Sequence, residues 1–226
     1  MRIAFWKGLV VLWITGVLVA AFAVEIPRLP ILEQSARNLY FHVPMWFTMI
    51  LGFGLAVWYS LRYLLRGRAE DDLKAEQAAR VAVLFGVLGL LTGSLWARFT
   101  WGAWWNWDPK QTLALAQLLL LGAYFALRSA VEEERRRARL SAAYAFLALL
   151  SVPFLLFIVP RQLPSLHPGA EGNPAFDEIT APQMRVVFYA AVLGFLGLFA
   201  WLFELSYRQA RLRRLLEAQR EQIEEP

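Results

Sequence analysis

Six apolar stretches, each about as long as a membrane is thick, dominate this sequence of 226 residues. A helix needs about 20 mostly apolar residues to cross the hydrocarbon core of a bilayer. Inside lipid, each backbone amide and carbonyl must find its partner within the protein, which excludes an open sheet. We therefore predict an all-α integral membrane protein with a single domain, residues 1–226, built as one bundle of six transmembrane helices. The predicted spans are residues 5–24, 43–65, 79–97, 112–131, 140–159 and 184–207.

The first apolar stretch has a second interpretation. Two basic residues, Arg2 and Lys7, precede it, and residues 21–23 read Ala-Phe-Ala, which resembles a signal-peptide cleavage site. The apolar run of residues 8–24 is longer than the core of a usual signal peptide. Its length favours an uncleaved helix, and the orientation of the other spans is the same in either case.

Basic residues predict the orientation of the bundle. With six spans, both termini and the loops after the second and fourth spans lie on one side of the membrane. That side holds 17 of the 23 lysines and arginines, and the opposite side holds the remaining six, which are Arg28, Arg37, Arg98, Lys110, Arg161 and Arg185. Positive residues favour the cytoplasmic side, so we predict cytoplasmic termini. The tail from residue 208 onward is expected to continue the last span inward as a short charged helix.

The segment between the third and fourth spans is unusually aromatic. Residues 101–108 read Trp-Gly-Ala-Trp-Trp-Asn-Trp-Asp, and the spacing would place most of these tryptophans on one face of a short interfacial helix. Tryptophans also gather in belts at membrane interfaces, but four in eight residues is denser than a belt requires. We expect a flat platform on the outer side, suited to a large planar ligand with a charged edge. The other tryptophans are assigned to belts or packing: Trp6, Trp13, Trp46, Trp58, Trp96 and Trp201.

The chain has two histidines, and both fall in predicted outer segments. His42 begins the second span within Phe-His-Val-Pro, and His167 lies in the last outer loop within Leu-His-Pro. A neutral imidazole is a good iron ligand and the usual axial ligand of haem. Two imidazoles from different segments could therefore hold a haem iron from both faces. The alternative, that each is an amphipathic interfacial residue, stays open.

Three local signals predict how the helices begin, pack and bend. Asp108 followed by Pro109 is a natural N-cap and first-turn pair, so Asp108 acts either as a cap alone or as a cap with a role toward a ligand or partner. Gly89 and Gly93 have the G-x-x-x-G spacing that permits close helix packing, within the chain or against a partner. Pro153 is expected to kink the fifth span.

These residues together resemble a known group of proteins. Residues 101–108 match the tryptophan-rich signature WGxxWxWD, and an outer histidine lies on each side of it. The chain thus resembles, over essentially its whole length, the WWD-domain haem-handling proteins of cytochrome c maturation, the CcmC, CcmF and CcsA families. The larger CcsA and CcmF have more spans and further histidines inside the membrane, so the chain is most similar to the CcmC family of the system I pathway. Lys110 departs from that pattern, which has arginine there.

The resemblance implies a haem-handling protein of the cytoplasmic (inner) membrane that is not an enzyme. Haem b would bind at the outer, periplasmic face with His42 and His167 as axial iron ligands. Arg37 and Lys110 would contact the haem propionates, unless they are ordinary interfacial anchors. The haem chaperone CcmE would receive the haem, and CcmA, CcmB and CcmD would complete an ATP-driven complex. The haem platform and chaperone-docking surface would comprise Trp101, Gly102, Trp104, Trp105, Trp107 and Asp108.

Missing motifs limit what the chain does alone. It has no cysteine, so it forms no thioether bond or disulfide itself, and it lacks the phosphate loop G-x-x-x-x-G-K-[ST]. The net charge of +5 is explained as a topology signal without binding to nucleic acid.

Several alternatives stay open at this level. One is a CcsA-like haem export or ligation subunit, and another is a structural membrane subunit without a ligand. A third is an intramembrane enzyme that uses Asp108 and a histidine, with Asp177 and Glu178 in the last outer loop. A transporter of an unrelated solute is disfavoured because the span centres are uncharged.

Overall fold

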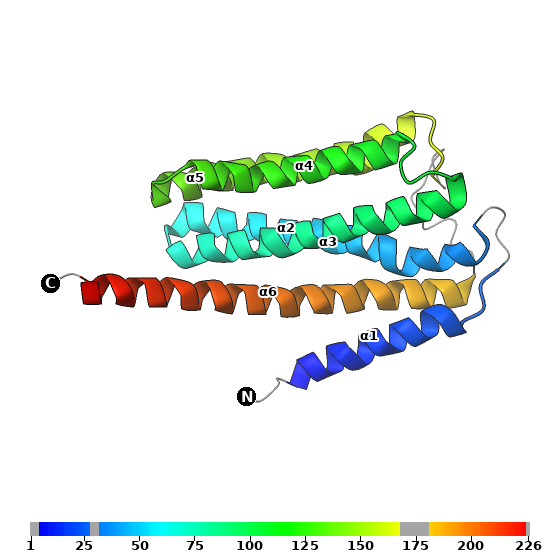
Figure 1. The fold of residues 1–226 in the computed structure, drawn as a ribbon, viewed down its shortest axis with the longest axis horizontal. Coiled ribbons are helices and arrows are strands. Elements are labelled where there is room, and N and C mark those ends of the chain that lie inside the picture. Colours follow the sequence, from blue (N-terminus) through cyan, green and yellow to red (C-terminus); the bar gives the residue numbers. More distant parts are fainter. Residues whose placement is uncertain (1–4, 28–31, 168–180, 225–226) are drawn as a thin grey trace.

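The computed structural model describes residues 5–27, 32–167 and 181–224, and its secondary structure in these ranges is helical (Figure 1). Asp177 and Glu178, noted above, lie outside the described residues. The described ranges contain six α-helices, two 3-10 segments (η1 and η3) and one π-helical segment (η2). Their bounds are α1 Phe5–Ala23, η1 Glu33–Asn38, α2 Leu39–Arg66, α3 Ala69–Trp101, α4 Pro109–Ala130, α5 Glu134–Val152, η2 Pro153–Ile158, η3 Val159–Gln162 and α6 Pro182–Glu224.

Six helical segments are long and apolar enough to cross a membrane, which confirms the predicted all-α, six-span fold. Several helices extend beyond the predicted spans. The third helix begins at Ala69 rather than near residue 79, because its first turns are polar yet still helical. The last helix continues to Glu224, which confirms the predicted charged extension of the sixth span.

The helices lie side by side in an elongated bundle (Figure 1). The α2–α3 pair forms the centre, the α4–α5 pair covers one side of it, and α6 covers the other side. The larger group of buried apolar side chains fills the space between these five helices, including Met49, Phe53, Phe85, Leu121, Tyr124 and Phe199. Burial of such side chains away from lipid and water fixes the relative positions of the helices.

Helix α1 packs at the periphery, mainly against α6. Gly194 and Gly197 on α6 allow this approach: a Cβ at Gly194 would lie 2.6 Å from Ile14 Cδ1, and one at Gly197 would lie 3.0 Å from Val10 Cγ2. Near the start of α1, Lys7 pairs with Glu204 at 3.0 Å. A second buried group, which includes Val17, Ala21, Tyr40 and Phe188, joins α1 and α6 to the start of α2.

The glycines of α3 pack against α2, which confirms the predicted close helix approach and places it within the chain. A Cβ at Gly89 would lie 3.0 Å from Trp46 Nε1, and a Cβ at Gly86 would lie 2.7 Å from Met49 Sδ. Helix association in a membrane depends on such packing of small residues, since lipid tails supply little hydrophobic driving force between helices.

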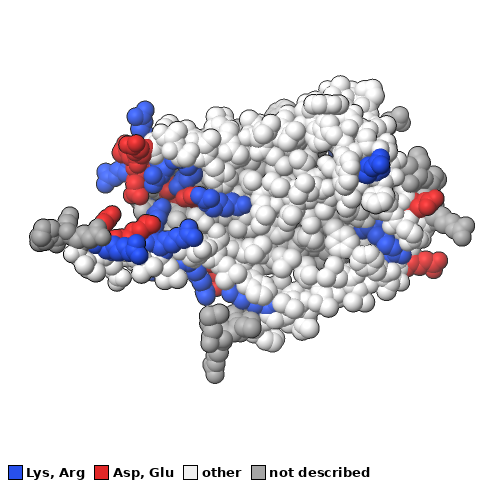
Figure 2. Space-filling model, viewed as in Figure 1, with Lys and Arg blue, Asp and Glu red and all other residues white. Residues whose placement is uncertain are grey.

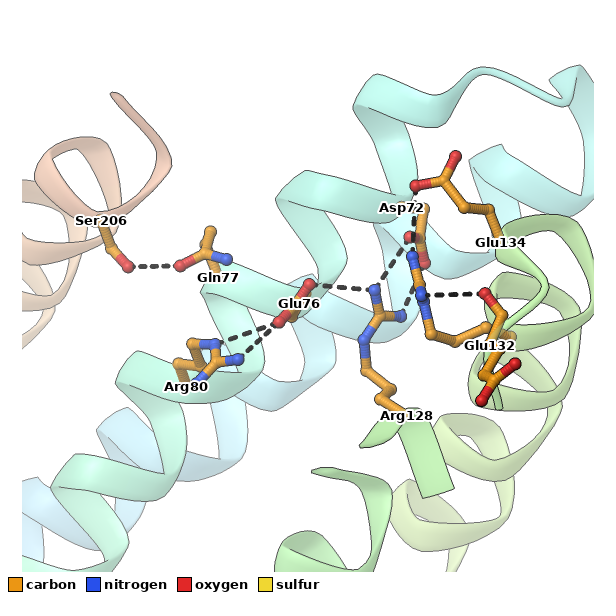
Figure 3. Close-up of polar contacts among 9 residues, drawn as sticks. Asp72, Glu76, Gln77, Arg80, Arg128, Glu132, Glu134 and Ser206 are labelled. Carbon is orange, nitrogen blue, oxygen red and sulfur yellow. Dashed lines mark hydrogen bonds and ion pairs between the residues drawn. The ribbon is translucent and has the colours of Figure 1, made fainter. Parts of the chain in front are cut away.

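Charged side chains gather at one end of the bundle, where the α2–α3 turn, the α4–α5 turn and the end of α6 lie (Figure 2). A polar network ties three helices together there (Figure 3). Arg128 on α4 is buried and binds Asp72 at 2.8 Å and Glu76 at 2.9 Å on α3. On α3, Gln77 accepts a hydrogen bond of 2.6 Å from Ser206 on α6. The network fixes α4 and α6 to α3 at this end.

Candidate functional site

A cavity of about 240 Å³ lies at the opposite end of the bundle, between α2, α3, α4 and the η2–η3 segment. Its few polar lining residues include both histidines of the chain, His42 and His167. A mostly apolar cavity with a few polar groups is the usual composition of a ligand site. The apolar lining residues include Leu32, Leu39, Val43, Phe47, Ile50, Leu90, Ala114, Leu156, Phe157 and Pro160.

His42 lies in the first turns of α2 and is held by the backbone of α3. Its Nδ1 lies 2.9 Å from the carbonyl oxygen of Gly89 and 3.3 Å from Thr92 Oγ1. A carbonyl oxygen accepts and cannot donate, so Nδ1 carries the proton and Nε2 keeps its lone pair. The ring fits here because α3 has glycine opposite it: a Cβ at Gly93 would lie 2.6 Å from His42 Cε1. The packing of α2 on α3 therefore sets the position and the tautomer of His42.

His167 is held in the same manner by a carboxylate. Its Nδ1 lies 2.8 Å from Asp108 Oδ1, and its ring contacts Trp101 edge-on at 4.8 Å between centroids. The carboxylate accepts a hydrogen bond from Nδ1–H, so Nε2 of the neutral ring keeps its lone pair. A histidine whose second nitrogen donates to a carboxylate is the arrangement that supports metal-bound imidazoles in proteins.

Asp108 is the centre of this arrangement. Its side chain is 1% exposed and accepts hydrogen bonds from Lys110 N at 2.9 Å, Ser165 Oγ at 2.9 Å and Leu166 N at 2.7 Å, besides the His167 ring. Burial raises the pKa of the Asp108 carboxyl, but the His167, Leu166 and Ser165 donors outweigh it and hold the pKa well below its ordinary value. Asp108 therefore caps α4, as predicted, and also fixes the segment that carries His167.

The tryptophans of residues 101–108 do not share one helical face, so that expectation is wrong. Helix α3 ends at Trp101 because Gly102 adopts the left-handed conformation with φ of 80°. Trp107 also has positive φ, 55°, which takes the chain out of any helical path. Trp104 is 56% exposed and Trp107 is 76% exposed, and all four indoles lie outside the lining of the cavity. The rings of Trp105 and Trp107 meet edge-on at 6.0 Å between centroids.

Two other tryptophans line the cavity instead. Trp46 and Trp96 contact the ring of His42 edge-on, at 6.5 Å and 6.0 Å between centroids. Trp96 Nε1 donates a hydrogen bond of 3.0 Å to Ser35 Oγ, which orients the indole. Both tryptophans were expected from the sequence to serve in interfacial belts or in packing. Trp46 follows His42 by four residues, and this helical spacing could have predicted that the two side chains lie on the same face of α2.

The two predicted cations lie in different places. Lys110 lines the cavity. Arg37 lies outside its lining, and its guanidinium donates to the carbonyl oxygens of Ala21 at 2.6 Å and Val24 at 2.8 Å, where α1 ends. Arg161 on η3 lines the cavity and was not predicted as a site residue.

The fold and the cavity define a multi-pass membrane protein with a two-histidine site at one end of its helix bundle. The family model CcmC, described as heme exporter protein C, matches residues 2–222. The chain therefore belongs to the CcmC family.

Individual relatives agree with the family model. The chain is 31% identical to a heme exporter protein C of Paracoccus denitrificans over 184 residues, which covers 81% of this chain and 76% of that protein. It is 31% identical to a heme exporter protein C of Bradyrhizobium diazoefficiens over 193 residues, with 82% and 73% covered. It is 27% identical to that of Escherichia coli K12 over 195 residues, with 85% and 76% covered.

Proposed function

We propose that the protein binds haem b in the cavity between His42 and His167 and passes it on for cytochrome c maturation. One observation carries the proposal: two imidazoles from separate segments line one mostly apolar cavity. Each Nδ1 faces an acceptor, so both Nε2 atoms are suited to bind iron. Membership of a family described as heme exporter protein C supports haem as the ligand.

The cavity suits the rest of the haem as well as its iron. Porphyrin faces are apolar, and the apolar lining with the indoles of Trp46 and Trp96 offers matching surface. The propionates are anionic, and the cation Lys110 lies in the lining where α4 begins. Arg37 is a second candidate for a propionate, although its hydrogen bonds to the end of α1 point to a structural role.

The tryptophan segment is proposed to dock the haem chaperone CcmE. Exposed indoles mark binding surfaces, and Trp104 and Trp107 are exposed beside the segment that holds His167. Trp101, Trp105 and Asp108 are less exposed and would support this surface, and the exposed Gly102 would form part of it. A haem delivered at this end would thus pass a short distance from its ligands to the partner.

The protein is proposed to work in the cytoplasmic membrane, in a complex with CcmA, CcmB and CcmD that hydrolyses ATP in a partner subunit. The charged end of the bundle would face the cytoplasm, and the cavity would face the periplasm, because positive residues are retained inside. The chain itself would act as a haem-handling subunit and not as an enzyme.

One arrangement favours a second candidate, acid–base catalysis by the Asp108–His167 pair at 2.8 Å. The geometry supports it less well than haem binding. In a catalytic triad the serine donates to the imidazole, whereas Ser165 Oγ donates to Asp108 at 2.9 Å.

The experiment that tests the proposal measures both binding and transfer. The purified full-length protein is loaded with haem and mixed with purified CcmE, and the haem bound to each protein is followed after separation. We expect loading of the wild type and movement of haem to CcmE. A Trp58→Phe variant, altered at a lipid-exposed position on α2, is the control and should behave as wild type. A wild-type protein that retains no haem would favour a structural subunit.

A further inference from the structure

The wall of the cavity opposite α2 and α3 has an unusual backbone. Helix α5 ends at Val152, and Pro153 begins a π-helical segment that runs to Ile158, followed by the 3-10 segment η3. The expected disturbance at Pro153 is therefore a change of helix type. In a π-helix the hydrogen bonds join residues five apart, as Val159 N to Phe154 O does here. Such segments are rare, and proteins often place them at functional sites.

This backbone brings a cation to the cavity. Leu156 and Arg161 are five residues apart, and both line the cavity together with Phe157 and Pro160. Phe157 and Arg161 are four residues apart, and they face the same cavity across the junction of η2 and η3. The η2–η3 segment thus places one arginine on a wall whose other lining residues are apolar.

No residue of the described ranges uses the hydrogen-bonding capacity of the Arg161 side chain. Arg161 is exposed, and in the described ranges of the chain it makes no ion pair and no side-chain hydrogen bond. Two other arginines at this end differ from it. Arg37 donates to the end of α1, and Arg98 donates to the carbonyl oxygen of Gly102. A guanidinium with its planar fork unoccupied is suited to bind a carboxylate through two parallel hydrogen bonds.

We propose that Arg161 binds a carboxylate of the cavity's ligand and thereby fixes which edge of the planar ligand faces η3. The inference rests on the proposed function, in which the ligand is haem and the carboxylates are its propionates. Lys110, at the start of α4, lines the same cavity from another element. Two cations from separate elements would hold the charged edge while the histidines hold the iron.

The test compares haem with haem dimethyl ester, in which both carboxylates are blocked. The full-length protein in detergent is titrated with each ligand, and the Soret band reports binding and axial ligation. Arg161→Gln removes the charge, and Arg161→Lys keeps the charge without the fork. Arg98→Gln is the matched control, because it removes one positive charge at the same end of the bundle from a residue outside the cavity lining.

We expect Arg161→Gln to weaken haem binding about fivefold to tenfold, since the pair is charge-assisted but exposed. The haem affinity of Arg161→Lys should lie between those of wild type and Arg161→Gln. Arg98→Gln should bind haem as wild type does. The ester should bind equally to wild type and to Arg161→Gln, and the axial-ligand spectrum should be the same in all complexes.

Each other result has a definite meaning. Equal loss of haem and ester by Arg161→Gln would show that Arg161 supports the fold and would overturn the inference. Unchanged haem binding would also overturn it, while leaving the proposed function intact. Should Arg161→Gln fail to fold, Arg161→Lys takes its place, and haem binding equal to wild type in that variant would overturn the inference. Equal affinity of the wild type for haem and its ester would overturn it as well, because no carboxylate contact would then contribute to binding. A wild type that binds neither ligand would overturn the inference and the proposed function together.

Discussion

The Nδ1 atom of His167 lies 2.8 Å from Oδ1 of Asp108, a residue 59 positions earlier in the chain. The carboxylate that caps α4 therefore also orients an imidazole of the segment that follows η3. The tryptophan segment and the second histidine are thereby one structural unit. A partner that moved one of them would disturb the other.

Replacing Asp108 with Asn tests this link. Asparagine keeps a cap oxygen for the backbone N–H of Lys110, but its neutral amide is a poorer acceptor for the His167 ring and the Leu166 N–H. We expect helix content to be unchanged and haem affinity to fall about tenfold to 100-fold, the usual effect of removing the partner of a metal-bound histidine. Circular dichroism and a Soret titration measure the two quantities. Ser165→Ala, which removes one donor to Asp108, should have a smaller effect; wild-type affinity in Asp108→Asn would contradict the link.

Replacing Gly93 with Ala should displace His42. The added Cβ would lie 2.6 Å from His42 Cε1, so the ring must move from its bond to Gly89. We expect a cost of about 1–3 kcal/mol in stability and loss of the bis-histidine spectrum. Gly54→Ala on α2 is the matched control, because a Cβ there meets no atom within 4 Å. Identical spectra for the two variants would show that the position of His42 does not matter for ligation.

The two groups of tryptophans are expected to have separate roles. Trp96→Phe removes an indole from the cavity wall and its hydrogen bond to Ser35, so haem affinity should fall and the Soret band should shift. Trp107→Phe changes an indole that is mostly exposed, so haem affinity should stay at the wild-type value while transfer to CcmE slows. Titration and the transfer assay separate the two effects. The reverse pattern would assign the haem platform to the tryptophan segment.

The polar network at the charged end is expected to stabilise the fold without affecting haem binding at the other end of the bundle. Arg128→Gln leaves Asp72 and Glu76 without their buried partner, and breaking a buried pair costs about 3–5 kcal/mol. We expect a clear fall in the thermal unfolding temperature, with a normal haem spectrum in the fraction that stays folded. Arg80→Gln breaks a more exposed pair with Glu76, so it should cost no more than about 1 kcal/mol. Equal losses of stability in the two variants would mean that burial does not increase the contribution of these ion pairs to stability.

The fold was predictable from the sequence because the signal for a membrane helix is local. Each span carries its own apolar run, so the six spans followed directly, as did the α6 extension beyond residue 208. The end of α3 could also have been predicted, since Gly102 is a typical helix terminator. The helical spacing of the tryptophans led instead to the wrong prediction of a short interfacial helix over residues 101–108.

The site was predictable only in part, because it depends on packing between distant segments. Both histidines were placed on one side by the span count, and the structure brings them to one cavity. The pairing of Asp108 with His167 joins two loops, and no single sequence states which loops meet. Arg161 lies on the 3-10 segment that follows the π-helical segment, and the pattern of apolar residues around Pro153 does not reveal this change of helix type.

The most direct test of the account is the absorption spectrum of the haem-loaded, purified protein, oxidised and reduced, for wild type and the two variants His42→Ala and His167→Ala. If His42 and His167 ligate the iron, the wild type has a low-spin, bis-histidine spectrum. Each single variant then loses that spectrum, and the double variant still inserts into the membrane without ligating haem. An unchanged low-spin spectrum in the double variant would contradict the assignment of His42 and His167 as the iron ligands.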